Sequence, residues 1–292
     1  MKRFNGPVYP ISPSFDENEK IEFKSTSKYI DYLSNNGVKI IMTTAGTSQF
    51  NLLTNKEIRE LNLTVSRFKG QKILGLPQLS TLHLLKEIEY LNNNLDGDDI
   101  SLLILFPERY YSDDQIVQFF EDVCIVSNFP ILVHGNLLKK GMGGTYEYSK
   151  PLLSRLSEID GFIGIKEEAS NIMHSTENIS KNLEVIVAGG SMKRFWSLEP
   201  HGATTYLVGV GSFNPKWEEQ FYNEYYTDMV TSKNIITQIE NPLFKTFMKC
   251  GWHLSMRTAL KHMGFIKSDR RPFNQPTEKQ KQNIINALNK IL

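Results

Sequence analysis

The chain has 292 residues, of which 40% are hydrophobic and 22% charged, a composition typical of a soluble globular protein and not of a disordered one. Its 33 Lys and Arg residues against 32 Asp and Glu residues give no sign of binding to nucleic acid or to an anionic membrane surface. The expected partner is therefore a small molecule or another subunit.

The first residues, MKRFNGPVYPISP, are cationic at the start but soon reach prolines, so we expect no secretory signal there. The longest apolar run, ISLLILF, is far too short to cross a bilayer. Cys124 and Cys250 lie far apart and lack the spacing of a metal site. This cysteine usage favours a reduced protein, and we expect it to be cytoplasmic.

Short runs of β-branched and aliphatic residues recur along the chain, and we interpret them as strands. Longer segments with helical spacing lie between them, such as NKEIRELNLTVSRF, STLHLLKEIEYLNNN, DDQIVQFFEDVCIVSN and SKPLLSRLSEI. The predicted strands are Val8 to Ile11, Lys39 to Met42, Lys72 to Leu76, Ser101 to Phe106, Ile131 to His134, Phe162 to Lys166, Val185 to Ala188 and Thr204 to Val208.

This alternation of strand and helix predicts parallel strands joined by right-handed crossovers. Eight units favour an α/β fold of the (β/α)8 TIM-barrel type, with the site at the carboxyl ends of the strands; a doubly wound open sheet is the alternative. Beyond the eighth strand, PKWEEQFYNEYYTDMVTSKN and the segments to KQKQNIINALNKIL have helical patterns only. We therefore predict a barrel over residues 1–215 and a C-terminal helical extension over residues 216–292.

The segment DGFIGIKEEASN ends an apolar strand on Lys166. One interpretation is a solvated lysine, the usual environment of this residue type. The other is a nucleophilic amine: apolar surroundings disfavour the ammonium form, so more of the amine is neutral and able to condense with a carbonyl as a Schiff base. The protonated imine then stabilises negative charge on the adjacent carbon, which permits cleavage or formation of a carbon–carbon bond, or loss of water.

A cluster of small hydroxyl residues, TTAGTSQFNLLT, follows the apolar run VKIIM, where a strand should lead into a loop. Such residues serve a turn, a helix cap or one wall of a site that hydrogen-bonds a small polar ligand. We expect Thr43 and Thr44 to finish the strand and Thr54 to cap the helix that begins at Asn55. Thr47, together with its neighbour Ser48, is then the functional candidate.

Over nearly its whole length the chain resembles the superfamily of dihydrodipicolinate synthase and N-acetylneuraminate lyase, which are class I aldolases. The resemblance is carried by the opening GPVYPISPSFDENEKIEFKSTSKYIDYLSNNGVKIIMTTAGTSQFNLLTNKEIREL, by GIKEEASN and by DRRPF. Within the superfamily, AGTSQFNLL and HGATTYLVGVGSFNP most resemble the 5-dehydro-4-deoxyglucarate dehydratases. The resemblance implies a (β/α) barrel with a Schiff-base lysine.

The motif Gly-Ile-Lys-Glu of that superfamily identifies Lys166 as the imine-forming residue. The resemblance also implies that the loop at Thr47 holds the carboxylate of a 2-oxo acid beside Lys166, and that Thr47 relays a proton. The remaining substrate contacts that it implies are Gly46, Ser48, Gly190 and Val208.

The chain departs from the superfamily at several of these positions. His134 stands where a proton-shuttling tyrosine is usual, and it is either a hydrogen-bonded structural residue or an imidazole that moves protons near neutral pH. Lys139 stands at the offset of the usual arginine. Tyr110 or Tyr111 corresponds to a tyrosine that often reaches across a subunit contact.

The sequence thus predicts a Schiff-base-forming lyase, aldolase or dehydratase, that acts on a 2-oxo acid such as pyruvate or a keto-deoxy sugar acid. The alternatives are a condensation like that of dihydrodipicolinate synthase, or a degenerate homologue that binds a metabolite without turnover. Lys193, after Gly190, suits an acidic substrate better than a polyol tail. The six histidines form no metal-ligand pattern, so we expect no metal and no other cofactor.

The assembly is expected to be a homodimer or a homotetramer, as is common in the superfamily. The segment FYNEYYTDM places four aromatic residues at neighbouring-turn spacing on a helix, where they form one apolar face. That face packs either on its own barrel or on a neighbouring subunit. The residues are Phe221, Tyr222, Tyr225 and Tyr226.

Overall fold

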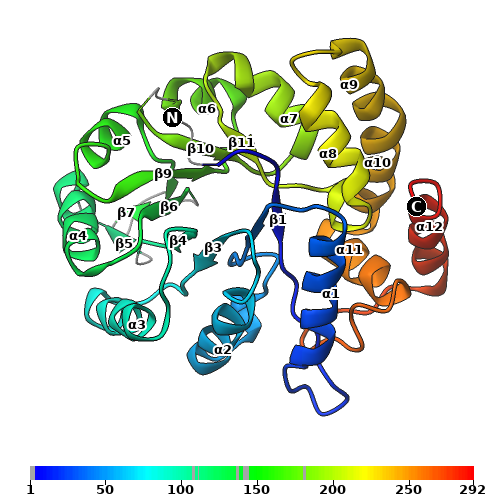
Figure 1. Cartoon of the computed structure of the whole chain (residues 1–292), viewed down its shortest axis with the longest axis horizontal. Helices are drawn as coiled ribbons and strands as arrows, with labels where there is room; N and C mark the ends of the chain where they lie inside the picture. Colours follow the sequence, from blue (N-terminus) through cyan, green and yellow to red (C-terminus); the bar gives the residue numbers. More distant parts are fainter. Residues whose placement is uncertain (1–3, 107–108, 111, 136–137, 141–144, 180–181) are drawn as a thin grey trace.

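The computed structural model describes residues 4–106, 109–110, 112–135, 138–140, 145–179 and 182–292. Eight parallel strands form one sheet in the order β1-β2-β3-β4-β6-β9-β10-β11, and they ring the centre of the view in Figure 1. Each strand overlaps one of the predicted strands. The strands are β1 (Val8–Pro10), β2 (Ile40–Met42), β3 (Gln71–Gly75), β4 (Ile100–Ile104), β6 (Ile131–Gly135), β9 (Phe162–Glu167), β10 (Glu184–Val187) and β11 (Thr205–Tyr206).

The sheet closes between its first and last strands. Val8 forms a parallel bridge with Leu207, and the Val208 amide donates a hydrogen bond to the Val8 carbonyl at 2.9 Å. An open doubly wound sheet leaves its two edge strands apart, so that alternative is excluded. The predicted (β/α)8 barrel is confirmed.

Helices follow the strands and cover the outside of the barrel (Figure 1). Their apolar faces pack on the outer faces of the strands in one large hydrophobic core. A smaller core fills the barrel interior and includes Val8, Met42, Ile73 and Ile186. The helices of this outer layer are α1 (Phe23–Asn35), α2 (Asn55–Val65), α3 (Thr81–Asn94), α4 (Asp113–Val126), α5 (Lys150–Leu156), α6 (Ile172–Asn178) and α7 (Ser191–Leu198).

The C-terminal segment is helical, as predicted, and packs beside α1 on the right of Figure 1. Among the helices that the structure describes, none is long and apolar enough to cross a membrane. The elements of this segment are η3 (Val210–Ser212), α8 (Pro215–Glu224), α9 (Met229–Ile235), the π-helical turn η4 (Ile236–Glu240), α10 (Asn241–Cys250), α11 (Trp252–His262) and α12 (Glu278–Leu288).

A second, three-stranded sheet was not predicted from the sequence. It consists of β5 (Arg109–Tyr110), β7 (Leu138–Lys140) and β8 (Thr145–Tyr146), with β5 parallel and β8 antiparallel to β7. These strands are two or three residues long and, unlike the short strands of the barrel, do not lie in apolar runs, so no pattern in the sequence indicates them.

Thr54 caps α2, as expected. Its hydroxyl accepts from the Glu57 amide, and the Glu57 carboxylate accepts from the Thr54 amide, which completes a capping box. The same carboxylate accepts two hydrogen bonds from Arg270, at 2.6 and 2.9 Å. Arg270 belongs to the segment DRRPF, so this pair fastens the C-terminal segment to the barrel.

Candidate active site

The two central side chains of the site lie side by side on the inner face of the barrel. Strand register pairs Lys166 of β9 with His134 of β6 on one side and with Ile186 of β10 on the other. Residues in register on neighbouring strands point to the same face, and Ile186 belongs to the interior core. Lys166 is 1% exposed, so the expectation of a solvated lysine is wrong.

Lys166, His134 and Glu168 form a connected polar cluster. The Lys166 Nζ lies 3.0 Å from His134 Nε2, and that nitrogen lies 3.0 Å from a Glu168 carboxylate oxygen. Lys166 also donates directly to the other oxygen of Glu168. One amine, one imidazole and one carboxylate are therefore in mutual contact, which permits a proton to move among them.

Sequence reasoning missed Glu168, although a signal was present. Side chains two positions apart in an extended chain point to the same face, so a carboxylate two residues after Lys166 was a candidate partner. Glu167, between them, points away: it accepts from the Ala169 amide at 2.6 Å and from the Ser175 hydroxyl at 3.1 Å. The motif GIKEEASN thus places the Glu168 carboxylate in the site, whereas the Glu167 carboxylate binds the segment that follows β9.

Burial sets the protonation of this cluster. It lowers the pKa of Lys166 to about 7, because the barrel interior disfavours the ammonium form. Glu168 acts in the opposite direction, since a carboxylate in contact stabilises the cation, but its side chain is 34% exposed and is screened by water. A substantial fraction of Lys166 is therefore neutral near pH 7.

His134 is also held in its neutral form. Its pKa lies well below the usual range because the ring is buried and because Lys166 is close. Within the described part of the chain, the buried Nδ1 has no hydrogen-bond partner. Nε2 is the atom that faces both Lys166 and Glu168, so the ring can exchange protons with them through that nitrogen.

The loop after β2 forms a wall with free donors. Among the described residues, the amides of Gly46 and Thr47 and the hydroxyl of Thr47 donate no hydrogen bond. Ser48 differs, because its hydroxyl donates to the Ile11 carbonyl at 2.6 Å and its amide donates to the Thr44 carbonyl at 2.9 Å. The structure therefore leaves Gly46 and Thr47 available to an anion but engages both donors of Ser48 within the protein.

A cavity of about 270 Å³ opens at the carboxyl ends of β10 and β11, next to this loop. Its polar boundary is made by the Thr47 side chain, by Ser191 and by the glycines at positions 189, 190 and 209. The cavity therefore includes Thr47, Gly190 and Val208, three of the substrate contacts that the sequence suggested. Its apolar boundary consists of Pro10, Leu207, Val208, Phe244, Met248 and Trp252.

Two buried glutamates from the C-terminal segment hold the loops of this cavity. Glu218 accepts from the amides of Gly209 and Gly211 at 3.2 and 3.0 Å, and from the Ser191 hydroxyl at 3.2 Å. Ser191 has a backbone φ of 47°, a conformation that non-glycine residues rarely adopt and that its surroundings must maintain. Glu240 accepts from two amides in the first turn of α7, both at 2.9 Å.

These glutamates are the second contribution that sequence reasoning missed. Burial raises the pKa of Glu218 to about 7 and that of Glu240 to about 8. Both come from the C-terminal helical segment, where nothing in the local sequence pattern distinguishes a buried glutamate from an exposed one.

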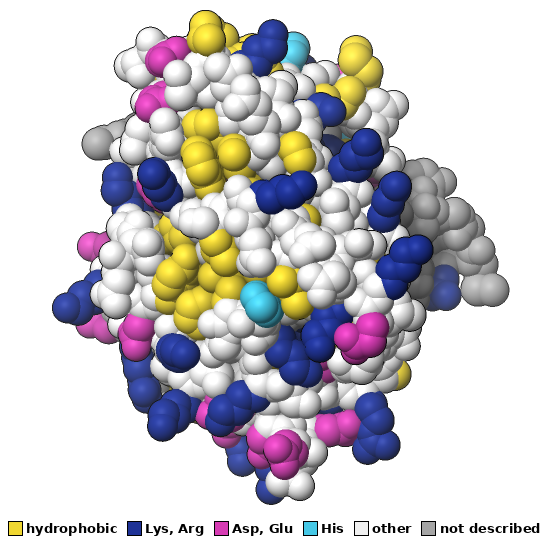
Figure 2. Space-filling view, turned by 90° about the vertical axis from the view of Figure 1, so that its right-hand side faces the viewer, with side chains coloured by type: hydrophobic (Ala, Val, Ile, Leu, Met, Phe, Trp, Pro, Cys, Tyr) yellow, Lys and Arg dark blue, Asp and Glu magenta, His cyan; other side chains and the backbone are white. Residues whose placement is uncertain are grey.

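The aromatic face of α8 packs mainly on its own barrel. Phe221 and Tyr225 are buried and contact the ring of Phe195 on α7, at centroid distances of 6.4 and 5.4 Å. Tyr226 is 60% exposed, and its hydroxyl donates to Glu199. This face therefore gives no support to a subunit contact. Figure 2 views the side of the C-terminal helices and shows hydrophobic side chains gathered among separate charged ones.

The remaining candidates lie elsewhere. The backbones of Tyr110 and Lys139 enter the small sheet, where β5 runs beside β7, and Tyr111 lies outside the described residues. Lys193 is exposed on α7 and does not line the cavity, so the cation that favoured an acidic substrate is not part of the cavity wall.

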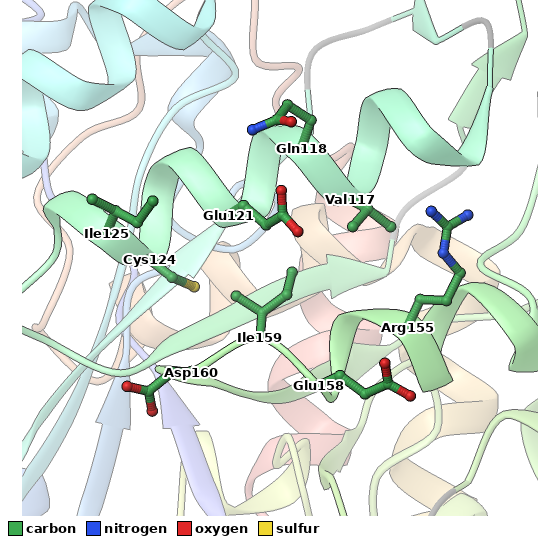
Figure 3. A pocket seen from close by; sticks show the side chains of 9 residues that line it. All are labelled: Val117, Gln118, Glu121, Cys124, Ile125, Arg155, Glu158, Ile159 and Asp160. Atoms are coloured by element: carbon green, nitrogen blue, oxygen red, sulfur yellow. The ribbon is translucent and has the colours of Figure 1, made fainter.

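A larger groove of about 870 Å³ lies on the outer surface, between α4 and the end of α5 with the residues that follow it (Figure 3). Cys124 is its one nucleophilic side chain among the described residues that line it, and burial raises the pKa of that thiol to about 12. A thiol of that pKa is protonated at neutral pH and unreactive. The described lining of this groove therefore offers no reactive thiol at neutral pH.

The sequence model of the dihydrodipicolinate synthetase family matches residues 113–291. The chain is 23% identical over 262 residues to a 4-hydroxy-tetrahydrodipicolinate synthase of Parabacteroides distasonis, which covers 88% of this chain and 86% of that protein. It is 22% identical over 295 residues to the enzyme of the same name from Archaeoglobus fulgidus, covering 99% and 98%.

Solved structures are similar in fold at low identity. Dihydrodipicolinate synthase of Thermotoga maritima has a TM-score of 0.82 at 21% identity and covers 99% of this chain and 98% of that one. YagE, a prophage protein of the dihydrodipicolinic acid synthase family from E. coli K12 that was solved in complex with pyruvate, has a TM-score of 0.83 at 15% identity and covers 99% of both chains.

Proposed function

We propose, since the chain belongs to the dihydrodipicolinate synthetase family, that it is a class I aldolase-type lyase that forms a Schiff base between Lys166 and a 2-oxo acid. The observation that carries this proposal is a lysine 1% exposed, with a pKa of about 7, in contact with a neutral imidazole. An amine that is neutral at physiological pH is the nucleophile that this chemistry requires.

The carboxylate of the 2-oxo acid would bind at the loop after β2. Gly46 and Thr47 offer two amides and one hydroxyl that are not engaged within the described part of the protein. Charge-assisted hydrogen bonds of this kind orient an anion and hold its carbonyl carbon for attack. Ser48 would act by bracing the loop against the end of β1, through its hydrogen bond to the Ile11 carbonyl.

The cluster of His134 and Glu168 would carry protons during imine formation. Attack of the neutral amine leaves a proton on nitrogen and negative charge on the former carbonyl oxygen, which must be protonated before water leaves. The His134 Nε2, 3.0 Å from the Lys166 amine, can move that proton, and the partly exposed Glu168 connects it to solvent. This pair would replace the usual tyrosine.

The sequence resemblance to the 5-dehydro-4-deoxyglucarate dehydratases gives a second and more specific candidate activity, the dehydration of a keto-deoxy sugar acid. It rests on AGTSQFNLL and HGATTYLVGVGSFNP, whereas the two curated relatives above are synthases. A panel of pyruvate with aldehydes, against keto-deoxy sugar acids, separates condensation from dehydration by the products formed.

Reductive trapping tests the imine. Incubation with pyruvate and borohydride should add the reduced adduct to the peptide that contains Lys166. Lys72 provides a matched control, because it is the other buried lysine among the described residues, 5% exposed, but is paired with Asp99. The variant Lys72→Gln should trap pyruvate like the wild type, and Lys166→Gln should not. An unmodified Lys166 peptide would contradict the proposal.

We also propose a homo-oligomer, although the aromatic face of α8 no longer argues for it. One structure similar in fold is described as the first monomeric dihydrodipicolinate synthase variant, so the fold itself does not require assembly. Light scattering at micromolar concentration decides the question, and a single monomeric species would contradict this part of the proposal.

A further inference from the structure

We infer that the cavity beside the proposed imine site takes an uncharged apolar group of aryl size, so that the substrate or the acceptor aldehyde carries such a group at the end remote from the 2-oxo acid. This inference rests on the proposed function and names the substrate class of the same site.

The composition of the cavity wall is the first observation. Six of its lining residues are apolar, and none of the described residues that line it carries a charge. The Ser191 hydroxyl is already used, because it donates to Glu218 and accepts from the Gly209 amide at 2.9 Å. Only Thr47, at the end nearest the proposed carboxylate contact, keeps a free polar side chain. A substrate tail rich in hydroxyls or a second carboxylate would therefore lose water there and find no free side-chain partner beyond Thr47.

The aromatic side of the cavity is held in place by packing. The rings of Phe244 and Trp252 lie 4.8 Å apart at an angle of 31°, and Trp252 also contacts the buried Phe247 at 5.9 Å. A Cβ atom on residue 209 would come within 2.6 Å of the Phe244 ring, so glycine at that position permits the close approach. Packed rings of this kind offer a flat apolar surface in a fixed place.

The position of the cavity relative to Lys166 is the second observation. Lys166 is in register with Ile186 of β10, and the chain runs from the end of that strand at Val187 to Gly189 and Gly190 in the cavity wall. Thr47 lies in that wall as well. A 2-oxo acid whose carboxylate meets Thr47 and whose carbonyl meets Lys166 therefore extends its other end along β10 and β11, toward Phe244 and Trp252.

The size of the cavity fits this occupant. An apolar cavity of about 150 Å³ is enough to hold benzene. The volume here, about 270 Å³, leaves room for one ring and a short chain that leads to it.

The corresponding reaction joins pyruvate to an apolar aldehyde. Loss of a proton from the methyl carbon of the Lys166 iminium gives the enamine, whose electron pair forms a bond to the aldehyde carbon. The aldehyde oxygen takes up one proton and becomes a hydroxyl group. Water then hydrolyses the new iminium, which releases a 4-hydroxy-2-oxo acid and restores the amine. The reverse sequence cleaves the same bond, and neither direction needs an oxidant or reductant.

Reductive trapping with two 2-oxo acids of contrasting ends tests the inference. With borohydride present, 2-oxo-4-phenylbutanoate should label Lys166 at a half-saturating concentration about ten-fold lower than 2-oxoglutarate, because burial of a phenyl ring favours binding by at least that factor. Equal labelling, or a preference for 2-oxoglutarate, would overturn it.

A charge placed at the cavity rim gives a second test. Met248 lines the cavity and is 61% exposed, so Met248→Lys should fold and should reduce or reverse the preference for the phenyl compound. Met229, on α9, is 58% exposed and does not line the cavity, so Met229→Lys is the matched control and should keep the wild-type preference. Loss of the preference in both variants, or in neither, counts against the inference.

Failure of the proposed function is distinguishable from failure of this inference. If no 2-oxo acid labels Lys166, the imine proposal falls. Calorimetry with 4-phenylbutanoate and glutarate, which lack the oxo group, still reports the preference of the cavity. Tighter binding of 4-phenylbutanoate, lost in Met248→Lys but kept in Met229→Lys, supports the apolar tail; tighter binding of glutarate overturns it.

Discussion

Replacement of Glu168 by glutamine isolates the charge that opposes burial at Lys166. The amide has nearly the same shape as the carboxylate and can still contact the Lys166 amine and His134. It removes the negative charge that stabilises the ammonium form. The pKa of Lys166, about 7 in the native protein, should therefore fall.

The size of the shift follows from geometry and exposure. Two unit charges about 4 Å apart interact by roughly 4 kcal/mol at an effective dielectric constant of about 20. Because the Glu168 side chain is 34% exposed, we reduce this to about 1 kcal/mol. At about 1.4 kcal/mol per pKa unit, the pKa of Lys166 should fall by about 0.7. At pH about 6 the neutral fraction then rises roughly four-fold, while at pH about 9 it hardly changes.

The pH dependence of single-turnover trapping with pyruvate measures this shift, since the rate of amine attack follows the neutral fraction of Lys166. The acid limb of the profile should move to lower pH in Glu168→Gln. The matched control is Glu177→Gln, an exposed glutamate on α6, which should leave the profile unchanged. An unmoved limb, or one that moves to higher pH, would refute the assignment of Glu168 as the charge that opposes burial. A slower plateau at high pH would add that Glu168 also carries protons.

Three further predictions concern stability. Lys166→Met should raise the free energy of unfolding at pH 7 by about 1–3 kcal/mol in urea titrations. The reason is that the lowered pKa of this buried lysine destabilises the folded state. A destabilised variant would contradict that reasoning. Burial raises the pKa of Glu218 from 4.5 to about 7, so the folded state binds this proton more tightly than the unfolded state does. The free energy of unfolding should therefore fall as the pH rises from 4.5 to about 7. Glu218→Gln should flatten this pH dependence, and an unchanged slope would contradict the role given to Glu218. Arg270→Ala should cost about 1–2 kcal/mol above pH 5, and this difference should vanish as pH falls toward 2, because Arg270 lowers the pKa of the partly exposed Glu57 from 4.5 to about 2.

The strands were predictable because each is a short, nearly continuous apolar run buried on both faces, as parallel strands in a closed barrel must be. The position of Lys166 at the end of such a run was enough to predict where it lies along the barrel. Its protonation stayed open between a solvated ammonium group and a buried neutral amine, since burial and contact with His134 depend on how β6 and β9 are aligned.

The remaining parts of the site come from segments with no strand to place them. Phe244 and Trp252 lie on α10 and α11, and the sequence shows only that these helices have apolar faces. Glu218 is a similar case, because a glutamate on a helix is normally exposed and nothing local indicates that it accepts hydrogen bonds from two hydroxyls and two amides of distant residues. Such contacts join residues distant in the chain, so a pattern read along the chain does not contain them.

The parts of the site that come from strands and those that come from helices differ in how freely their residues can be replaced. A slip of one residue in β9 would turn Lys166 from the interior to the outer face, so the register with His134 and Ile186 fixes the amine as firmly as it fixes the sheet. Among the residues that the structure describes, no hydrogen bond joins α10 or α11 to a strand of the barrel, so their inward side chains can change without moving Lys166. Membership of the family therefore argues for the imine step, whereas the substrate must be argued from the cavity walls, of whose described residues six are apolar and none is charged.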